Sequence, residues 1–184
     1  AGRTADAIDK LQKAIMQMQK ELSGGLAAYL PPAPAGWTAG KIKSSSGAMG
    51  GEGQAGQWIQ LSRAYTRTAD KLSVEVAITN SPQLVGAQRA ALAVFANPQY
   101  VAMMNSNPNM DVEAVDRDGW TGWLVVNEQS DAQVAAFCGS TLLSVKARKP
   151  DKGAVETLFD AIDLKGLATA AATTGETATR PAGE

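Results

Sequence analysis

A methionine-rich segment is the first feature that could do chemistry. Met103, Met104 and Met110 are three of the chain's six methionines, and three asparagines lie among them. Thioether sulfur binds Cu(I), so this Met/Asn loop predicts a copper or small-ligand contact in an exported protein. Packing is the competing interpretation, because methionine also fills apolar cores and copper sites usually add His or Cys.

Acidic residues follow this loop. Asp111, Glu113, Asp116 and Asp118 precede Gly119, which is a calcium-like cluster without the D-x-[DN]-x-[DN]-G ladder or the distal Glu of a calcium loop. Apolar residues alternate with these acids, so we favour a strand ending in a turn.

A pair of carboxylates could also support glycoside hydrolysis, since two acids can meet from anywhere in a chain. Glu75 and Glu128 are such candidates, but both occupy alternating strand positions, which favours a solvated sheet face.

The chain lacks the residue types that most catalytic mechanisms require. The chain has no histidine, and Cys138 is its single cysteine. These absences exclude Ser-His-Asp and Cys-His nucleophiles, His-ligated zinc and C-x-x-C redox pairs. Gly139-Ser140 lacks the G-x-S-x-G elbow, and Cys138 ends an apolar run that suits a buried thiol. We therefore expect no enzyme and no cofactor.

Charge and hydropathy restrict the partners. Seventeen basic residues balance eighteen acidic ones, which argues against a nucleic-acid binder. No run reaches the roughly 18 apolar residues of a membrane span. The small residues Ala1-Gly2 at the start resemble the product of signal-peptide cleavage, so we predict a periplasmic or secreted protein.

Two tryptophans offer binding surface. Trp120 and Trp123 are three positions apart on an expected strand, so they should face opposite sides of a sheet. One is then core. The other either lies under a helix or anchors a partner or an apolar ligand.

The first 30 residues predict an amphipathic helix. Apolar residues recur at spacings of three and four, and Gly24-Gly25 would end or break the helix; the stripe comprises Ile8, Leu11, Ile15, Met18 and Leu22. Two heptads are few for a coiled coil, so we favour packing on the domain's own sheet over pairing between chains.

Period-2 alternation and turn residues then place the remaining elements. We expect strands at 41–48, 58–67, 72–79, 112–115, 120–126, 133–138 and 142–147, and helices at 82–96, 99–104 and from 151. Hairpin turns are expected at 68–71, 116–119 and 139–140. This order predicts an α+β domain over 31–167, whose antiparallel sheet is packed by an N-terminal, a middle and a C-terminal helix. From 168 to 184 the composition predicts a disordered tail.

A family resemblance rests on three segments: residues 78–82 (Ile-Thr-Asn-Ser-Pro), Asn97-Pro98, and residues 159–164 (Phe-Asp-Ala-Ile-Asp-Leu). With the order of strands and helices, they look like small exported bacterial proteins of the Mog1/PsbP-like superfold over about residues 26–167. The resemblance implies an α/β/α sandwich. Members include photosystem accessory proteins, a Ran-binding protein and secretion chaperones, so no site residue carries over.

The sequence therefore predicts a non-catalytic, exported accessory protein that binds another protein. The alternative is a small-molecule or copper binder that uses the Met/Asn loop and a Trp-lined pocket. Candidate contacts are Trp120, Trp123, Met103, Met104 and Met110.

Overall fold

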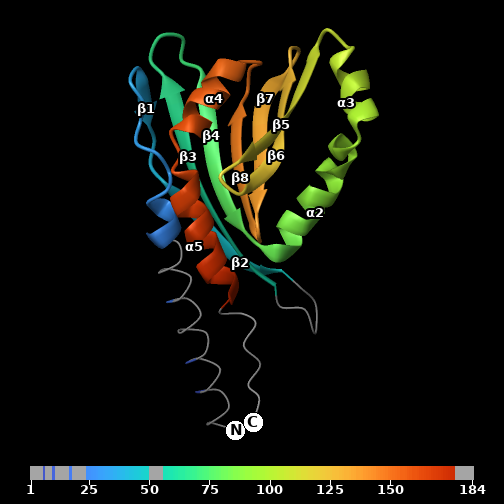
Figure 1. Ribbon diagram of the computed structural model, residues 1–184. Coiled ribbons are helices and arrows are strands. Elements are labelled where there is room, and N and C mark those ends of the chain that lie inside the picture. Colours follow the sequence, from blue (N-terminus) through green and yellow to red (C-terminus); the bar gives the residue numbers. More distant parts are fainter. Residues whose placement is uncertain (1–5, 7–9, 11–16, 18–23, 50–55, 177–184) are drawn as a thin grey trace.

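An antiparallel sheet with helices organises the chain in the computed structural model, which describes residues 24–49 and 56–176 and positions 6, 10 and 17 (Figure 1). The strands are β1 (Trp37–Ala39), β2 (Lys43–Met49), β3 (Gly56–Arg67), β4 (Ser73–Asn80), β5 (Met110–Arg117), β6 (Trp120–Asn127), β7 (Asp131–Cys138) and β8 (Thr141–Ala147). The helices are α2 (Pro82–Leu92), the 3₁₀ turn η1 (Ala93–Ala96), α3 (Pro98–Asn105), α4 (Lys152–Asp160) and α5 (Leu164–Glu176). The α+β class is confirmed.

Every strand pairing in the described sheet is antiparallel, in the order β1-β3-β4-β8-β7-β6-β5, with β2 also on β3. Strands β5 to β8 form a meander. The segment α2–η1–α3 carries the chain from β4, inside the sheet, to the far edge at β5. This crossing places one helical segment over four neighbouring strands.

Turn residues account for the tight hairpins. Lys71 lies in the β3–β4 turn with φ 61°, and Asp118-Gly119 joins β5 to β6 with φ 53° and 83°. Gly139, with φ 55°, joins β7 to β8. Positive φ is typical of Asp and Gly at the second and third turns, whereas Lys71 adopts it as a less usual residue type. The pairings of β3 with β4, β5 with β6 and β7 with β8 confirm the three predicted hairpins.

One face of the sheet holds the main core. Inward residues of β4 such as Val74, Val76 and Ile78 are fully buried, together with Leu158 of α4 and Leu167 of α5. Leu26 and Leu30, from the N-terminal segment, join the same cluster. Figure 1 shows α4 and α5 on this side of the sheet and α2 and α3 on the other.

The second face carries many small and polar side chains beside the larger Trp123, Phe137 and Leu142. Because side chains alternate along a strand, the neighbours of the core residues point to the α2 side. Cross-strand pairing there aligns Ser62, Ala77, Ser144, Ala135 and Trp123 in one row. Because most side chains in this row are short, they leave space beneath the helical segment next to Trp123.

The helical segment is fixed at its two ends. The Ser81 hydroxyl accepts a hydrogen bond from Leu84 N at 3.3 Å, and Ser81 N donates to Ser140 O at 3.2 Å. At the other end, the Asn105 amide donates to Val112 O at 3.0 Å and accepts from Val112 N at 2.7 Å. Asn105 thus copies the pairing of a neighbouring strand on the outer edge of β5.

Three expectations need correction. The tail boundary at 168 is wrong, because α5 continues to Glu176 and Ala171 is buried; alanine, a strong helix former, makes up much of this segment. The helix expected over 82–96 stops at Leu92 and tightens into η1. Strand β1 was not expected.

The N-terminal expectation is only partly covered by the described residues. Residues 24–27, which include Gly24-Gly25, are helical. The stripe from Ile8 to Leu22 lies outside the described residues. No helix among the described residues is long and apolar enough to span a membrane.

Gly122 and Gly86 give opposite predictions for alanine substitution. A Cβ at Gly122 would lie 2.0 Å from Ala135 O, so Gly122→Ala must push β6 from β7 and cost more than about 3 kcal/mol of unfolding free energy. Gly86, inside α2, has nothing within 4 Å of a Cβ. We expect Gly86→Ala to add about 0.5–1 kcal/mol.

Urea unfolding of both variants measures these changes. A Gly122→Ala midpoint equal to that of the original chain would contradict the close approach of β6 and β7.

Candidate functional site

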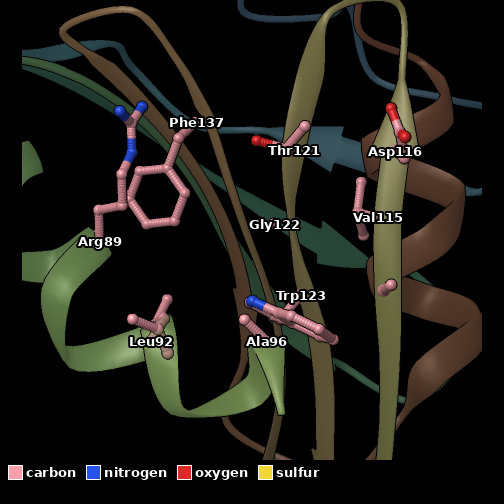
Figure 2. Close-up of a pocket in the computed structure, with 11 residues that line it drawn as sticks. Arg89, Leu92, Ala96, Val115, Asp116, Thr121, Gly122, Trp123 and Phe137 are labelled. Atoms are coloured by element: carbon pink, nitrogen blue, oxygen red, sulfur yellow. The ribbon is translucent and has the colours of Figure 1, made fainter. Parts of the chain in front are cut away.

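A hollow lies between the middle of the helical segment and the second face of the sheet (Figure 2). It has a volume of about 400 Å³. Leu92, Ala93 and Ala96 come from α2 and η1, while Trp123 and Phe137 come from β6 and β7. We call it the Trp123 hollow. It forms because the segment is anchored at Ser81 and Asn105 and crosses short side chains between them.

Trp123 forms the apolar centre of this site. Its ring centroid lies 5.5 Å from that of Phe95, which lies 5.7 Å from that of Tyr100. All three side chains are half-buried. Tilted aromatic pairs at such distances are favourable, so the cluster presents a stable apolar wall that solvent still reaches.

Arg89 of α2 stands on one side of the Trp123 hollow. Its Nη2 donates to Gly139 O at 3.1 Å, and its Cζ lies 5.4 Å from the Phe137 ring centroid. Phe137 is buried in a small cluster with Val85 and Leu142. This contact positions the guanidinium, yet within the described residues Arg89 pairs with no carboxylate.

Asp116 of β5 stands on the other side, with Thr121 between the two charges (Figure 2). Figure 2 shows the Thr121 hydroxyl directed from β6 towards Phe137. Asp116 pairs with no cation in the described part of the chain. The hollow is therefore apolar at its base and carries two unneutralised, opposite charges on facing walls.

A second hollow adjoins the first. It has a volume of about 360 Å³ and shares Leu92 and Trp123 with the Trp123 hollow. Phe95, Val125 and Ala135 supply further apolar lining, and Gln88 and Gln133 are at its polar end. We call it the Phe95 hollow. We call the two hollows together the groove.

The polar end of the groove is fixed by an ion pair. Lys146 Nζ lies 2.7 Å from Asp131 Oδ2, and Lys146 is the cross-strand neighbour of both Gln133 and Glu75. The hydrogen bond from Lys146 holds the pKa of the Asp131 carboxyl below its ordinary value of 3.8. Asp131 therefore keeps its negative charge at neutral pH.

The structure separates the two candidate tryptophans as their spacing predicts. Trp120 is fully buried in the main core, where Nε1 donates to Leu164 O at 2.9 Å. Trp123 faces the opposite side under η1. Trp120 thus ties β6 to α5, whereas Trp123 is available to a ligand.

The three methionines do not share a helix face. Met103 and Met104 are adjacent on α3, so their side chains point about 100° apart around the helix. Met103 is 58% exposed, while Met104 and Met110 are half-buried. Nothing in this placement gathers the sulfur atoms, and copper binding stays a prediction.

The acidic cluster is used for ion pairs on the α4 side of the sheet. Lys152 of α4 lies 2.9 Å from Asp111 and also binds Glu113. These contacts raise the pKa of Lys152 to about 12, mainly through the hydrogen bond with Glu113. In the described ranges, no three His, Cys, Asp or Glu residues are placed to hold a metal ion.

Sequence reasoning missed several residues of the groove. Arg89 and Phe95 were expected only as parts of the helix over 82–96, Asp116 as part of the turn at 116–119 and of the acidic cluster, and Phe137 as part of the strand over 133–138. The alternation of Gln133, Ala135 and Phe137 with buried neighbours does mark a second face, but it does not show what covers that face.

The Asp131–Lys146 pair predicts an acid titration. Because the folded-state pKa of Asp131 is lowered, the pair stabilises the fold above pH 3.8 and is lost as pH falls through the folded value. The gain is below about 1 kcal/mol for so exposed a pair. In Lys146→Met, the pH midpoint of the Asp131 carboxyl titration should return towards 3.8. The control variant is Lys149→Met. Carboxyl carbon NMR shifts measure both, and an unchanged midpoint in Lys146→Met would contradict the pairing.

Comparison with known proteins gives no relative. No protein-family model, curated protein or solved structure matches the chain.

Proposed function

We propose that this protein binds a small amphipathic molecule in the groove and does not transform it. The observation that carries the proposal is the half-buried Trp123–Phe95 wall beneath the helical segment, with polar groups at its rim. Mostly apolar hollows of roughly 300–1,000 Å³ with a few placed polar groups are typical of small-ligand sites.

Exposed surface favours a small ligand over a flat protein interface. The large exposed hydrophobic residues in the described part of the chain are Ile42, Val94 and Met103. They are few and lie before β2, in η1 and in α3, whereas a protein partner typically uses a contiguous apolar patch of several hundred Å². Binding without turnover is supported by the absence of histidine from the chain.

A protein partner is the second candidate, and the edge of β5 favours it. Among the described strands, β5 pairs only with β6, and Asn105 covers the outward N–H and C=O of Val112. By alternation, the outward groups of Ala114 and Asp116 can accept an added strand. Such a contact suits an accessory protein.

The variant Ala114→Pro separates the two candidates. It removes an outward N–H without breaking the β5–β6 ladder, as an edge strand tolerates. We expect a captured partner to be lost in Ala114→Pro but kept in Trp123→Ala, which changes the groove and leaves the backbone N–H groups of β5 intact. A partner still captured by Ala114→Pro would exclude the β5 edge.

The α/β/α arrangement similar to the Mog1/PsbP-like superfold is also a proposal. It is supported by helices on both sides of an antiparallel sheet (Figure 1). We also propose, from the sequence, that the protein is exported. Fractionation of native cells into cytoplasm and periplasm tests this proposal.

Binding of N-phenyl-1-naphthylamine, a neutral fluorescent apolar probe, tests the groove. We expect a saturable fluorescence increase with the original chain and about tenfold weaker binding with Trp123→Ala, because a large aromatic contact is lost. The matched control is Trp37→Ala, since Trp37 packs under Arg67 on β1, outside the groove. Equal affinity in all three proteins would exclude the groove as the site.

A further inference from the structure

We propose that the ligand of the groove is a zwitterion with a bulky apolar group, such as a free α-amino acid with an aromatic or large aliphatic side chain. This inference rests on the proposed function and adds the charge pattern of the ligand. It comes from the two opposite charges of the Trp123 hollow and from the apolar Phe95 hollow beside it.

Arg89 is prepared to bind a carboxylate. The bond from Nη2 to Gly139 O and the stacking on Phe137 fix the guanidinium plane. A guanidinium has five N–H donors, so most remain for a ligand after that bond. Arginine binds carboxylates through two parallel hydrogen bonds, which makes a carboxylate the best-matched anion here.

Asp116 supplies the complementary charge. It lies across the Trp123 hollow from Arg89, on β5 (Figure 2). No lysine or arginine of the described chain neutralises it. An ammonium group is compact and donates three hydrogen bonds, so a carboxylate on the facing wall, with the Thr121 hydroxyl between, suits it.

The position of the Phe95 hollow indicates where the apolar group of the ligand would lie. The Trp123 hollow shares Trp123 and Leu92 with the adjoining Phe95 hollow, where Val125 and Ala135 are apolar. A ligand whose charged ends lie between Arg89 and Asp116 can therefore direct a side chain against Phe95. A simple anion could bind only Arg89 and a simple cation only Asp116, both of which are exposed, whereas a molecule with both charges gains a contact on each side.

Four probes test the charge pattern: L-phenylalanine, 3-phenylpropionate without the ammonium group, 2-phenylethylamine without the carboxylate, and glycine without the apolar group. The readout is the Trp123 indole N–H signal in the ¹H–¹⁵N NMR spectrum, assigned by its loss in Trp123→Phe. We expect phenylalanine to shift this signal and to bind about tenfold more tightly than each of the other three.

Charge-neutralising variants assign each end. In Arg89→Gln, phenylalanine should bind about tenfold more weakly and no better than 2-phenylethylamine. In Asp116→Asn, it should bind no better than 3-phenylpropionate. Lys149→Gln and Glu128→Gln are matched controls outside the groove and should leave all affinities unchanged.

The results separate this inference from the proposed function. If N-phenyl-1-naphthylamine binds in a Trp123-dependent way but phenylalanine neither binds nor prefers both charges, the zwitterion inference is wrong and the groove still binds apolar ligands. If neither probe perturbs Trp123, both proposals are wrong. Equal phenylalanine affinities in Arg89→Gln and the original chain would also overturn the inference.

Discussion

The unequal composition of the two sheet faces is the constraint on which the structure depends. Alternation along each strand sends Val74, Val76 and Ile78 into one core and leaves fewer large apolar residues on the reverse side, where many side chains are short or polar. Helices α4 and α5 fill the first face with large apolar side chains. The second face offers much less to pack against, so the segment above it cannot seal the space.

The groove follows from how that segment is held. It must run from the interior strand β4 to the edge strand β5, and it is attached near Ser81 and at Asn105. Between these points Leu92 and Phe95 are only half-buried. The same crossing brings Arg89 on α2 opposite Asp116 on β5, although 27 positions separate them in sequence. Neither α2 nor β5 neutralises its own charge, so Arg89 and Asp116 both remain charged at the Trp123 hollow.

The sequence predicted local structure well, for identifiable reasons. The alternation at 72–79 and 120–126 and the hairpin turns at Asp118-Gly119 and Gly139 need only nearest neighbours to be read. The opposite orientation of Trp120 and Trp123 follows from the same period. What the sequence could not provide is the strand order, because nothing local in β4 indicates that its partner is β8. Arg89, Phe95 and Asp116 depend on that order, so the site could not be assembled from the sequence. The methionines attracted attention by composition, but α3 does not present Met103 and Met104 on one face.

The most direct measurement is a set of intermolecular NOEs between bound N-phenyl-1-naphthylamine and methyl groups of the protein. A ligand in the groove must lie against Leu92 and Val125, which line the Phe95 hollow. We expect NOEs from the aromatic protons of the probe to both residues. NOEs confined to Val94 and Met103, which are exposed outside the groove, would exclude binding in the groove.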